Sequence, residues 1–562
     1  MLPFGSVLVA ALGLSSTALA HPHNTSCRYL PTDVGWPTPG DWDRLNTTIG
    51  GKLIRGEPLA QSCFQPSEDV AKCSQVRDQW GSNSIYYDDP VAVMSPFWLN
   101  DSCNPFLSSP NSTCTLDNTA SYAINVTDAA SVIAGIEFSQ QKNIRLSIKN
   151  TGHDYLGRST GRGSLALWTH NLQDVSVITN YTSPKYSGPA IKVGAGMLAH
   201  EVATFAVEHG MRVTAGLCPS VGFAGGYSQN GGYGQLSSVY GLAADNTLEF
   251  EVVTTDLRHI TASPSTNADL YWALSGGGSG TYAVVLSQTV KAHADGPIAG
   301  ASFVWTTANA TSFWSAIEAW YKLVPAFNQI PGFTASWIFT SEVFRLTAAT
   351  LPGGTAADVH AVLQDFYQAA QELDILFVAN KTIENSTFVE LYDTFVPPSL
   401  ADSSFPSNNT IGSRLVPPGV VQDNLTALLD VYQRILGDTT VPGEIVVGGT
   451  SNNVSHANTA LMSSSAAVSF PDDTSIEGLE LIQAKVNTWQ DWVKALTPGS
   501  GSYINEATYD NPDWKADYYG DNYDGLLEVK RKYDADFTLW PRAAGGSDIY
   551  WEEDADGRLC RA

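Results

Sequence analysis

The chain has 562 residues, of which 43% are hydrophobic and 15% are charged, so it can bury large cores in more than one domain. Its formal net charge is −26. This acidity excludes nucleic acid and an anionic membrane surface as expected partners, because both attract Lys and Arg. After the first twenty residues, no apolar run approaches the roughly 18 residues that a membrane helix needs.

Residues 1–20 have the pattern of a secretory leader. An apolar run extends from Val7 to Leu14, and Ala18, Leu19 and Ala20 form a small-residue cleavage site. The sequence also has about a dozen N-x-S/T sequons, a density that favours N-linked glycans, among them Asn24, Asn46, Asn100, Asn125, Asn309, Asn385 and Asn453. The sequence therefore predicts a secreted, extracellular glycoprotein, and it sets no oligomeric state.

Seven cysteines leave one unpaired in an oxidising compartment. The expected pairs are Cys63–Cys73 and Cys103–Cys114, which close short loops, and then Cys27–Cys560, which joins the mature termini. Six cysteines allow fifteen pairings, so this set is one choice among several. Cys218 is the expected free thiol. No C-x-x-C is present, and no zinc or other metal site is expected.

The chain changes character along its length. Residues 21–117 are rich in Pro, Gly and Trp and hold five of the seven cysteines, which predicts a disulfide-stapled segment. Thr127 and Asp128 can then cap a helix with an apolar stripe of Val132, Ile133 and Ile136, which leads into a strand at about residue 144. Further short strands are predicted at 165–168, 190–193, 211–214 and 247–255.

The region after residue 296 combines helices with strands. Amphipathic helices are predicted at 312–326, 356–373, 425–436 and 476–496, with strand-like runs between them such as 445–449. Residues 194–199 fit G-x-G-x-x-A, but they are expected to be a strand-end turn, because the strand-turn-helix unit and the downstream acid of a nicotinamide fold are missing. The fold class is α+β.

Two stretches carry the chemistry. The first, KNTGHDYLGRSTG at 149–161, follows a predicted strand, so His153 should lie on a turn that leaves it. The second, at 218–246, begins with Cys218 and is dense in glycine, which lets the backbone approach a large planar or phosphorylated ligand closely. His153 and Cys218 could therefore hold one ligand from two sides.

These two stretches, together with YGDNYDGLLEVKRKYDADFTLW at 519–540, resemble the motifs of the berberine-bridge-enzyme-like oxidases in the vanillyl-alcohol-oxidase superfamily. The resemblance covers nearly the whole chain after the leader. It implies a two-part PCMH-type FAD-binding domain at 118–295 and a substrate domain at 296–500 with an antiparallel sheet covered by helices. It also implies a segment at 501–562 that returns to the FAD domain.

The resemblance implies bicovalent FAD, with His153 bonded to the flavin 8α-methyl and Cys218 bonded to C6. It places the backbone of 149–152 around the pyrophosphate, with Lys149 in place of a usual arginine, and Asn522 against the flavin. Val221 matches the position that gates oxygen access to flavin C4a, where a small side chain indicates an oxidase. The implied cofactor-binding set is Lys149, Asn150, Thr151, Gly152, His153, Asp154, Gly157, Cys218, Pro219, Ser220, Val221, Gly222, Gly225, Gly226, Gly231, Gly232, Tyr240, Leu242, Val253 and Asn522.

The catalytic base has two candidates. Several relatives place a carboxylate on a GGxxxE-like strand, but the corresponding run at 448–453 is GGTSNN, without Glu. Carbohydrate-oxidising relatives use the tyrosine of a YxN motif, which is present as Tyr503 to Asn505. Tyr503 is the favoured base if a neighbour lowers its pKa, and Glu506 is the second candidate.

The expected function is a secreted FAD-dependent oxidase. It would transfer a hydride from a C–H bond of an alcohol, oligosaccharide or secondary-metabolite substrate to flavin N5 and reduce O2 to H2O2. The alternatives are a flavin-retaining extracellular glycoprotein with little turnover, a dehydrogenase with another electron acceptor and, more distantly, a glycoside hydrolase.

Overall fold

The computed structural model describes residues 27–95, 102–107, 114–397, 402, 408–454 and 462–562. The expected leader and the sequons at Asn24 and Asn100 lie outside the described residues. Within these ranges, no helix is both long enough and apolar enough to cross a membrane.

The N-terminal segment is rich in loops and held by disulfide bonds. Its short elements are α1 (Pro39–Thr48), β1 (Leu53–Arg55), η1 (Gln61–Cys63), α2 (Val70–Gln79) and α3 (Ser84–Tyr87). Thr38 and Asp41 form a capping box that starts α1. The disulfide bonds are Cys27–Cys560, Cys63–Cys73 and Cys103–Cys114, which confirms the predicted pairing, and Cys218 is the free thiol.

A small mixed sheet follows. Its strands are β1, β2 (Tyr122–Asn125), β3 (Leu146–Lys149) and β4 (Leu165–Trp168), in the order β1-β2-β4-β3, and β4 pairs in parallel with β2 and β3. The predicted helix is α4 (Ala129–Lys142), and the Asp128 carboxylate caps it by accepting the Ser131 backbone N–H at 2.8 Å. Val132 and Ile136 are buried in the core under this sheet. The predicted helix and strand are thus confirmed, and the loop that carries His153 leaves the end of β3.

A second sheet of five antiparallel strands has the order β5-β6-β10-β8-β9. The elements of this region are β5 (Val175–Ser183), β6 (Tyr186–Gly194), α5 (Ala199–Glu208), β7 (Met211–Arg212), η3 (Phe223–Tyr227), α6 (Ser237–Tyr240), α7 (Ala243–Asn246), β8 (Thr247–Val253), β9 (His259–Ala262), α8 (Ala268–Leu274), β10 (Val284–Lys291) and β11 (His293–Ala294). The turn at 194–198 ends β6 as expected, but α5 follows it, so the prediction that no helix is present was wrong. Because β6 pairs only antiparallel neighbours in this sheet, the unit is not a parallel dinucleotide-binding one.

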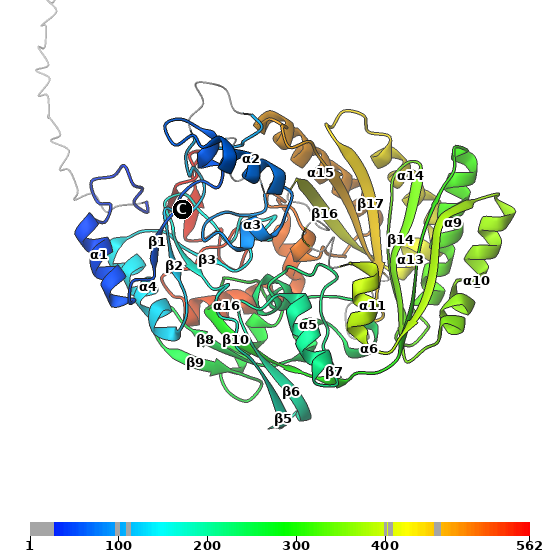
Figure 1. Ribbon diagram of the computed structural model, residues 1–562, viewed down its shortest axis with the longest axis horizontal. Coiled ribbons are helices and arrows are strands. Elements are labelled where there is room, and N and C mark those ends of the chain that lie inside the picture. The colour runs from blue at the N-terminus through cyan, green and yellow to red at the C-terminus, as the bar shows by residue number, and fades with distance from the viewer. Residues whose placement is uncertain (1–26, 96–101, 108–113, 398–401, 403–407, 455–461) are drawn as a thin grey trace, which may run out of the picture.

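The next region is built on a sheet of seven antiparallel strands in the order β15-β12-β14-β13-β17-β18-β16. Its elements are β12 (Ile298–Thr306), α9 (Ala310–Phe327), β13 (Thr334–Phe339), β14 (Val343–Pro352), α10 (Ala356–Glu372), β15 (Leu376–Asn385), α11 (Phe388–Phe395), β16 (Asn409–Val416), α13 (Pro418–Asp423), α14 (Leu425–Leu436), β17 (Glu444–Ser451), β18 (Met462–Ser469) and α15 (Ile476–Leu496). The four predicted helices correspond to α9, α10, α14 and α15. Figure 1 shows α9, α10 and α14 on the outer side of this sheet, with the elements of the first two sheets beyond its other face.

The two faces of the seven-stranded sheet have different surroundings. Alternate residues such as Trp305, Trp337 and Phe344 pack with Trp320 of α9 into one aromatic core between the sheet and the helices. Side chains on the opposite face are left to form one wall of a cavity. This division follows from the period of two along each strand.

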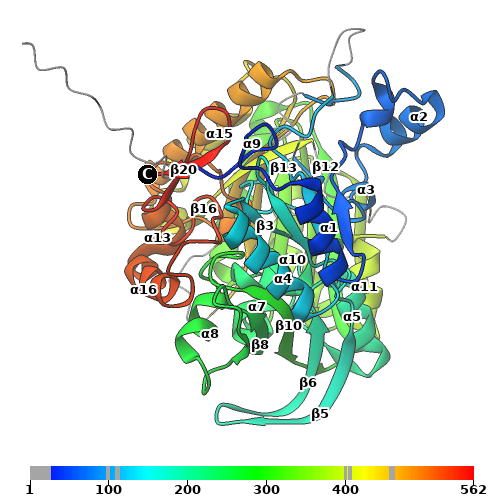
Figure 2. The ribbon, with the colours of Figure 1, turned by 90° about the vertical axis from the view of Figure 1, so that its left-hand side faces the viewer.

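The C-terminal segment crosses back to the first two sheets. It contains η4 (Ile504–Glu506), η5 (Lys515–Tyr519), η6 (Gly520–Asn522), α16 (Tyr523–Tyr533), β19 (Trp551–Glu553) and β20 (Leu559–Arg561). Figure 2 shows α16 beside α8, and the two share a buried core with Tyr282. Lys530 of α16 is buried and donates to the Asp534 carboxylate and to the Thr281 and Leu539 carbonyl oxygens at 2.6 to 2.7 Å. These bonds fix the segment that follows Tyr503. The fold is α+β, as predicted.

Candidate functional site

A cavity of about 730 Å³ lies between the glycine-rich stretch and the free face of the seven-stranded sheet. Its walls come from the loop after β3, from residues 216–230, from strands β13, β14, β16, β17 and β18, and from η4. A volume of this size is typical of a site for a cofactor together with a small substrate.

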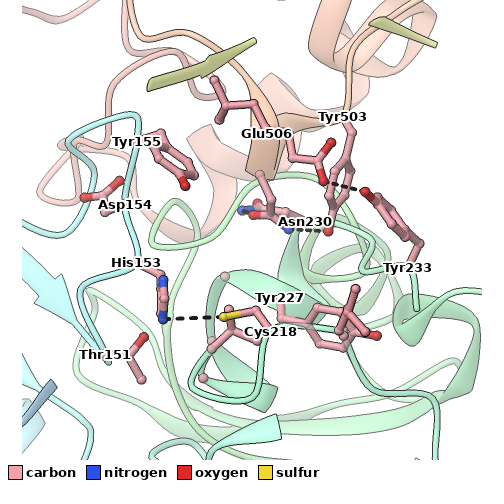
Figure 3. Close-up of a pocket in the computed structure, with 18 of the residues that line it drawn as sticks. Thr151, His153, Asp154, Tyr155, Cys218, Tyr227, Asn230, Tyr233, Tyr503 and Glu506 are labelled. Atoms are coloured by element: carbon pink, nitrogen blue, oxygen red, sulfur yellow. Dashed lines mark hydrogen bonds between the residues drawn. The ribbon is translucent and has the colours of Figure 1, made fainter. Parts of the chain in front are cut away.

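His153 and Cys218 meet on one wall of this cavity (Figure 3). Cys218 Sγ lies 3.8 Å from His153 Nε2, and Ser220 Oγ lies 2.8 Å from the same nitrogen. Burial, with a smaller contribution from the Lys149 charge, lowers the pKa of His153 to about 4, so its imidazole is neutral at physiological pH. Burial raises the pKa of the Cys218 thiol to about 11, against hydrogen bonds from Ser220 and Val221 that act in the opposite direction.

The glycines beside these residues make room for Asn150. Its Nδ2 donates to the Ala195 carbonyl oxygen at 2.5 Å. A Cβ at Gly222 would lie 2.6 Å from Asn150 Nδ2, and a Cβ at Gly225 would lie 2.7 Å from it. A side chain at either position would therefore displace Asn150 and close part of the cavity.

The cavity wall presents polar atoms that the protein itself does not satisfy. Within the described part of the chain, five buried atoms of lining residues have no hydrogen-bond partner: Asn150 Oδ1, Arg158 Nη1, Tyr227 Oη, Gln229 Oε1 and Asn409 Oδ1. Unpaired buried polar groups are costly, so a ligand with several donors and acceptors is expected to complete them. The wall has both a cationic donor and amide and phenol oxygens, and this set fits a large polar cofactor such as FAD.

Tyr503 faces His153 and Cys218 from another wall of the cavity (Figure 3). Asn505 Nδ2 donates to Tyr503 Oη at 2.6 Å, and Asn230 Nδ2 donates to Asn505 Oδ1 at 2.7 Å. Burial raises the pKa of Tyr503 above its ordinary value, and this outweighs the hydrogen bond from Asn505. The phenol is therefore protonated at neutral pH and has its own O–H left to donate.

Glu506 lies beside Tyr503 and is held by two hydroxyl groups. Tyr233 Oη donates to one carboxylate oxygen, and Ser463 Oγ of β18 donates to the other at 3.5 Å. Burial raises the pKa of Glu506 to about 7, although both hydrogen bonds act in the opposite direction. A carboxyl group with this pKa can both hold and release a proton at physiological pH.

The sheet provides a wall of mixed polarity. Hydroxyl and amide groups alternate there with short apolar side chains and one arginine; the set comprises Ser336, Ile338, Arg345, Thr347, Asn409, Ile411, Val446, Thr450, Ser465, Ala467 and Ser469. Gly448 and Gly449 of β17 also line the cavity. They begin the GGTSNN run that aligns with the GGxxxE-like motif. The described strand offers no carboxylate from this run.

Of the residues that the sequence placed around a cofactor, Asn150, Thr151, Gly152, His153, Asp154, Cys218, Val221, Gly222, Gly225 and Gly226 line the cavity, as do the two catalytic candidates Tyr503 and Glu506. Gly157, Pro219, Ser220, Gly231 and Gly232 lie in the same loops but outside the lining. Asp154 closes its own turn, because its carboxylate accepts the Ser159 backbone and hydroxyl protons at 2.6 Å.

The other five residues of the predicted cofactor-binding set also lie outside the lining of this cavity. The buried Lys149 Nζ donates to the Tyr86 and Asp89 carbonyl oxygens at 2.9 and 2.7 Å, so it braces the N-terminal segment. Tyr240 stacks on His293 outside the cavity, and Leu242 begins α7. Val253 is part of the core under β8, and Asn522 is exposed at the end of η6, with no side-chain cap on α16.

The structure adds lining residues that the sequence had not singled out. Tyr155 and Arg158 belong to the first motif, and Tyr227, Gln229 and Tyr233 belong to the glycine-rich stretch. Tyrosines in a stretch of glycines were the available signal, since a large side chain among glycines must project either into a core or into a cavity. Burial raises the pKa of Tyr155 as well.

Comparison with known proteins agrees with this geometry. Two family models match: "FAD binding domain" over residues 120–263 and "Berberine and berberine like" over residues 502–540. The VAO-type flavoprotein oxidase VAO615 of Thermothelomyces thermophilus is 38% identical, with 100% of this chain and 99% of that protein covered. The bifunctional decalin synthase calF of Penicillium decumbens is 37% identical, with 99% of each chain covered.

A solved structure supports the same assignment. The crystal structure of the VAO-type flavoprotein MtVAO615 from Myceliophthora thermophila C1 superposes with a TM-score of 0.89 at 37% sequence identity, over 95% of this chain and 100% of that one. The residues around His153 and Cys218 fit FAD as the cofactor. The chain therefore belongs to the vanillyl-alcohol-oxidase superfamily, as a berberine-bridge-enzyme-like FAD-linked oxidoreductase.

Proposed function

We propose that this protein is a secreted oxidase in which FAD is bonded to both His153 and Cys218, and which oxidises a C–H bond next to a substrate hydroxyl. The observation that carries the proposal is the placement of two chemically different pairs around one cavity. His153 and Cys218 lie 3.8 Å apart on one wall, and Tyr503 and Glu506 lie on another. A flavin held by the first pair would present its ring system to the second.

The proposed bond to His153, part of the covalent tether of FAD at His153 and Cys218, is supported by the protonation state of the imidazole. His153 is neutral, because its pKa is lowered to about 4, and so it has a lone pair available for bonding. Each bond would replace a C–H bond of the cofactor with a C–N or C–S bond, which removes two electrons and two protons. Molecular oxygen takes them up as hydrogen peroxide.

Glu506 and Tyr503 would handle the proton of the substrate hydroxyl during turnover. With a pKa of about 7, Glu506 can accept the substrate hydroxyl proton at physiological pH. Tyr503 stays protonated, and the hydrogen bond that it accepts from Asn505 leaves its O–H free to hold the substrate oxygen. The sequence favoured Tyr503 as the base, and the proposal exchanges the two roles, because no cation faces the phenol to offset its burial in the described residues.

Bound FAD would supply the hydride acceptor and the route for electrons to O2. Asn150, Arg158 and Gln229 would hold it through the polar atoms that are otherwise unpaired. Val221 lines the cavity, and its small side chain supports access of O2 to the reduced cofactor and hence an oxidase over a dehydrogenase.

The substrate is a small molecule with at least one hydroxyl group. The sheet wall offers Ser and Thr hydroxyls next to Ile and Val side chains, which suits an alcohol, an oligosaccharide or a hydroxylated secondary metabolite. Secretion and N-linked glycans are supported by the leader pattern, by the sequons and by three disulfide bonds.

The test is anaerobic titration of the flavin-loaded protein with oligosaccharides, benzylic alcohols and hydroxylated polyketides. We expect one class to bleach the visible flavin spectrum, and air to restore it with release of hydrogen peroxide. Tyr503→Phe and Glu506→Gln should slow bleaching about 100-fold or more, the usual contribution of a group that moves or holds the proton.

Tyr518→Phe is the matched control, because Tyr518 donates to the Thr508 carbonyl oxygen in the same segment and does not line the cavity. It should leave the bleaching rate unchanged. If air does not restore the spectrum after bleaching, the protein is a dehydrogenase and the proposal of an oxidase is wrong. Equal bleaching rates in wild type, Tyr503→Phe and Glu506→Gln would overturn the roles given to these two residues.

A further inference from the structure

Ser220 connects the two residues of the proposed tether, His153 and Cys218, to the N-terminal segment. Its Oγ lies 2.8 Å from His153 Nε2 and 3.7 Å from Cys218 Sγ. Asn83, which is fully buried just before α3, donates its Nδ2–H to the same oxygen at 3.0 Å. One hydroxyl group therefore has three polar neighbours, and two of them are the residues that would bond the cofactor.

The contact from Asn83 constrains where the protons lie. An amide NH2 can only donate, so it occupies one of the two lone pairs of Ser220 Oγ. When His153 Nε2–H fills the second lone pair, the Ser220 proton is left to point at Cys218 Sγ. All three contacts are then satisfied by two lone pairs and one proton.

The same arrangement decides which histidine nitrogen can react. Figure 3 shows His153 Nε2 turned towards Cys218, and Nδ1 has no hydrogen-bond partner among the residues that the structure describes. A proton held on Nε2 leaves the lone pair on Nδ1. If the proton sat on Nδ1 instead, the available lone pair would be directed at Ser220 and away from a cofactor.

We infer that Ser220, oriented by Asn83, is a positioning residue for flavin attachment: it keeps the His153 proton on Nε2, so that Nδ1 forms the bond, and it donates to the Cys218 sulfur. The inference rests on the proposed tether and adds the residues that select its reacting atoms. As the Nδ1–C bond replaces a cofactor C–H bond, the second proton to leave is the one on Nε2. The two protons and two electrons go to O2 as hydrogen peroxide.

The thiol gains from the same hydroxyl. The surroundings of Cys218 raise its pKa by desolvation, so any donor to the sulfur favours loss of the thiol proton, and the hydrogen bond from Ser220 acts in that direction. Through Asn83, the disulfide-stapled segment orients the side chain of Ser220 in the glycine-rich stretch, 137 residues further along the chain.

The experiment follows covalent attachment directly. Full-length protein produced under riboflavin limitation is incubated with FAD in air, and the fraction of denatured chains that carry the mass of FAD is followed over time. Ser220→Ala and Asn83→Asp should each slow attachment about tenfold, the factor that one hydrogen bond of ordinary net strength supplies. Ser220→Thr, which keeps the hydroxyl, should attach FAD at the wild-type rate.

Ser228→Ala is the matched control. Ser228 is also buried in the glycine-rich stretch, but its hydroxyl donates to the Phe223 carbonyl oxygen and contacts neither tether residue. Thermal melting of every variant separates slow attachment from loss of the fold, and if Ser220→Ala does not fold, the size-conserving Asn83→Asp carries the test. Attachment at the wild-type rate in a folded Ser220→Ala or Asn83→Asp overturns this inference alone, whereas wild-type protein that never gains the mass overturns the proposed tether.

Discussion

Glu506 should make the stability of the protein depend on pH. Burial raises the pKa of its carboxyl group from 4.5 to about 7, a difference that corresponds to about 3 kcal/mol. Because the pKa is higher in the folded state, the contribution of Glu506 to stability is fully present below its unfolded value of 4.5 and is lost as the pH rises through about 7. Glu506→Gln removes the ionisation and with it this loss.

The expected change in Tm depends on the length of the chain. An unfolding entropy of about 2 cal/mol/K per residue makes about 3 kcal/mol equivalent to about 3 °C in Tm for a protein of 562 residues. Calorimetry of the flavin-loaded wild type and variant at about pH 5 and about pH 8.5 measures it. Wild type should lose about 2 °C more than Glu506→Gln between the two pH values, because the unfolded carboxyl group is already partly ionised at about pH 5.

The control for this measurement is Glu528→Gln, which replaces an exposed carboxylate on α16. Its melting temperature should follow that of the wild type at both pH values. A difference between wild type and Glu506→Gln that stays constant with pH would refute the claim that burial governs this carboxyl group.

Two further substitutions test the cavity wall and its support. Gly225→Ala places a Cβ 2.7 Å from Asn150 Nδ2, so the purified protein should contain little flavin per chain by visible absorbance, while Gly81→Ala, with no atom within 4 Å, should contain the wild-type amount. Retention of flavin by Gly225→Ala would contradict the proposed cradle. Arg414→Met removes the 2.7 Å partner of the buried Asp517 carboxylate, which keeps Lys494 at 2.8 Å, so it should cost about 1.5 to 3 kcal/mol and lower Tm by about 1 to 3 °C. An unchanged Tm would show that Arg414 does not anchor the segment before Tyr503.

Much of the secondary structure was predictable, because it is local. Helices α9, α10, α14 and α15 are long and amphipathic, and Asp128 supplied a clear start for α4. Helix α5 was missed, because Leu198 at its N-cap has no polar side chain, and the Glu201 carboxylate that accepts the Leu198 N–H lies inside the helix. The order of the seven strands could not be read either, because strand pairing joins residues more than a hundred positions apart, such as Ser336 and Thr450.

Site residues were predictable where a sequence motif marks the residue itself. His153 and Cys218 were identified from their own loops, and the structure brings their reactive atoms within 3.8 Å. The contacts of Lys149 could not be predicted, because its partners are the Tyr86 and Asp89 carbonyl oxygens, which lie about sixty residues earlier in the chain. The pKa of Tyr503 was open for the same reason: its burial depends on residues from several distant elements.

The measurement that tests the account most directly is the visible spectrum and intact mass of the acid-denatured protein, for wild type, His153→Ala, Cys218→Ala and the double variant. The account predicts that flavin absorbance and the mass of one FAD stay with the denatured wild-type chain, persist in each single variant, and are lost only in the double variant. Wild-type protein that releases all its flavin on denaturation, or that carries none, would contradict the central claim that FAD is bonded at both residues.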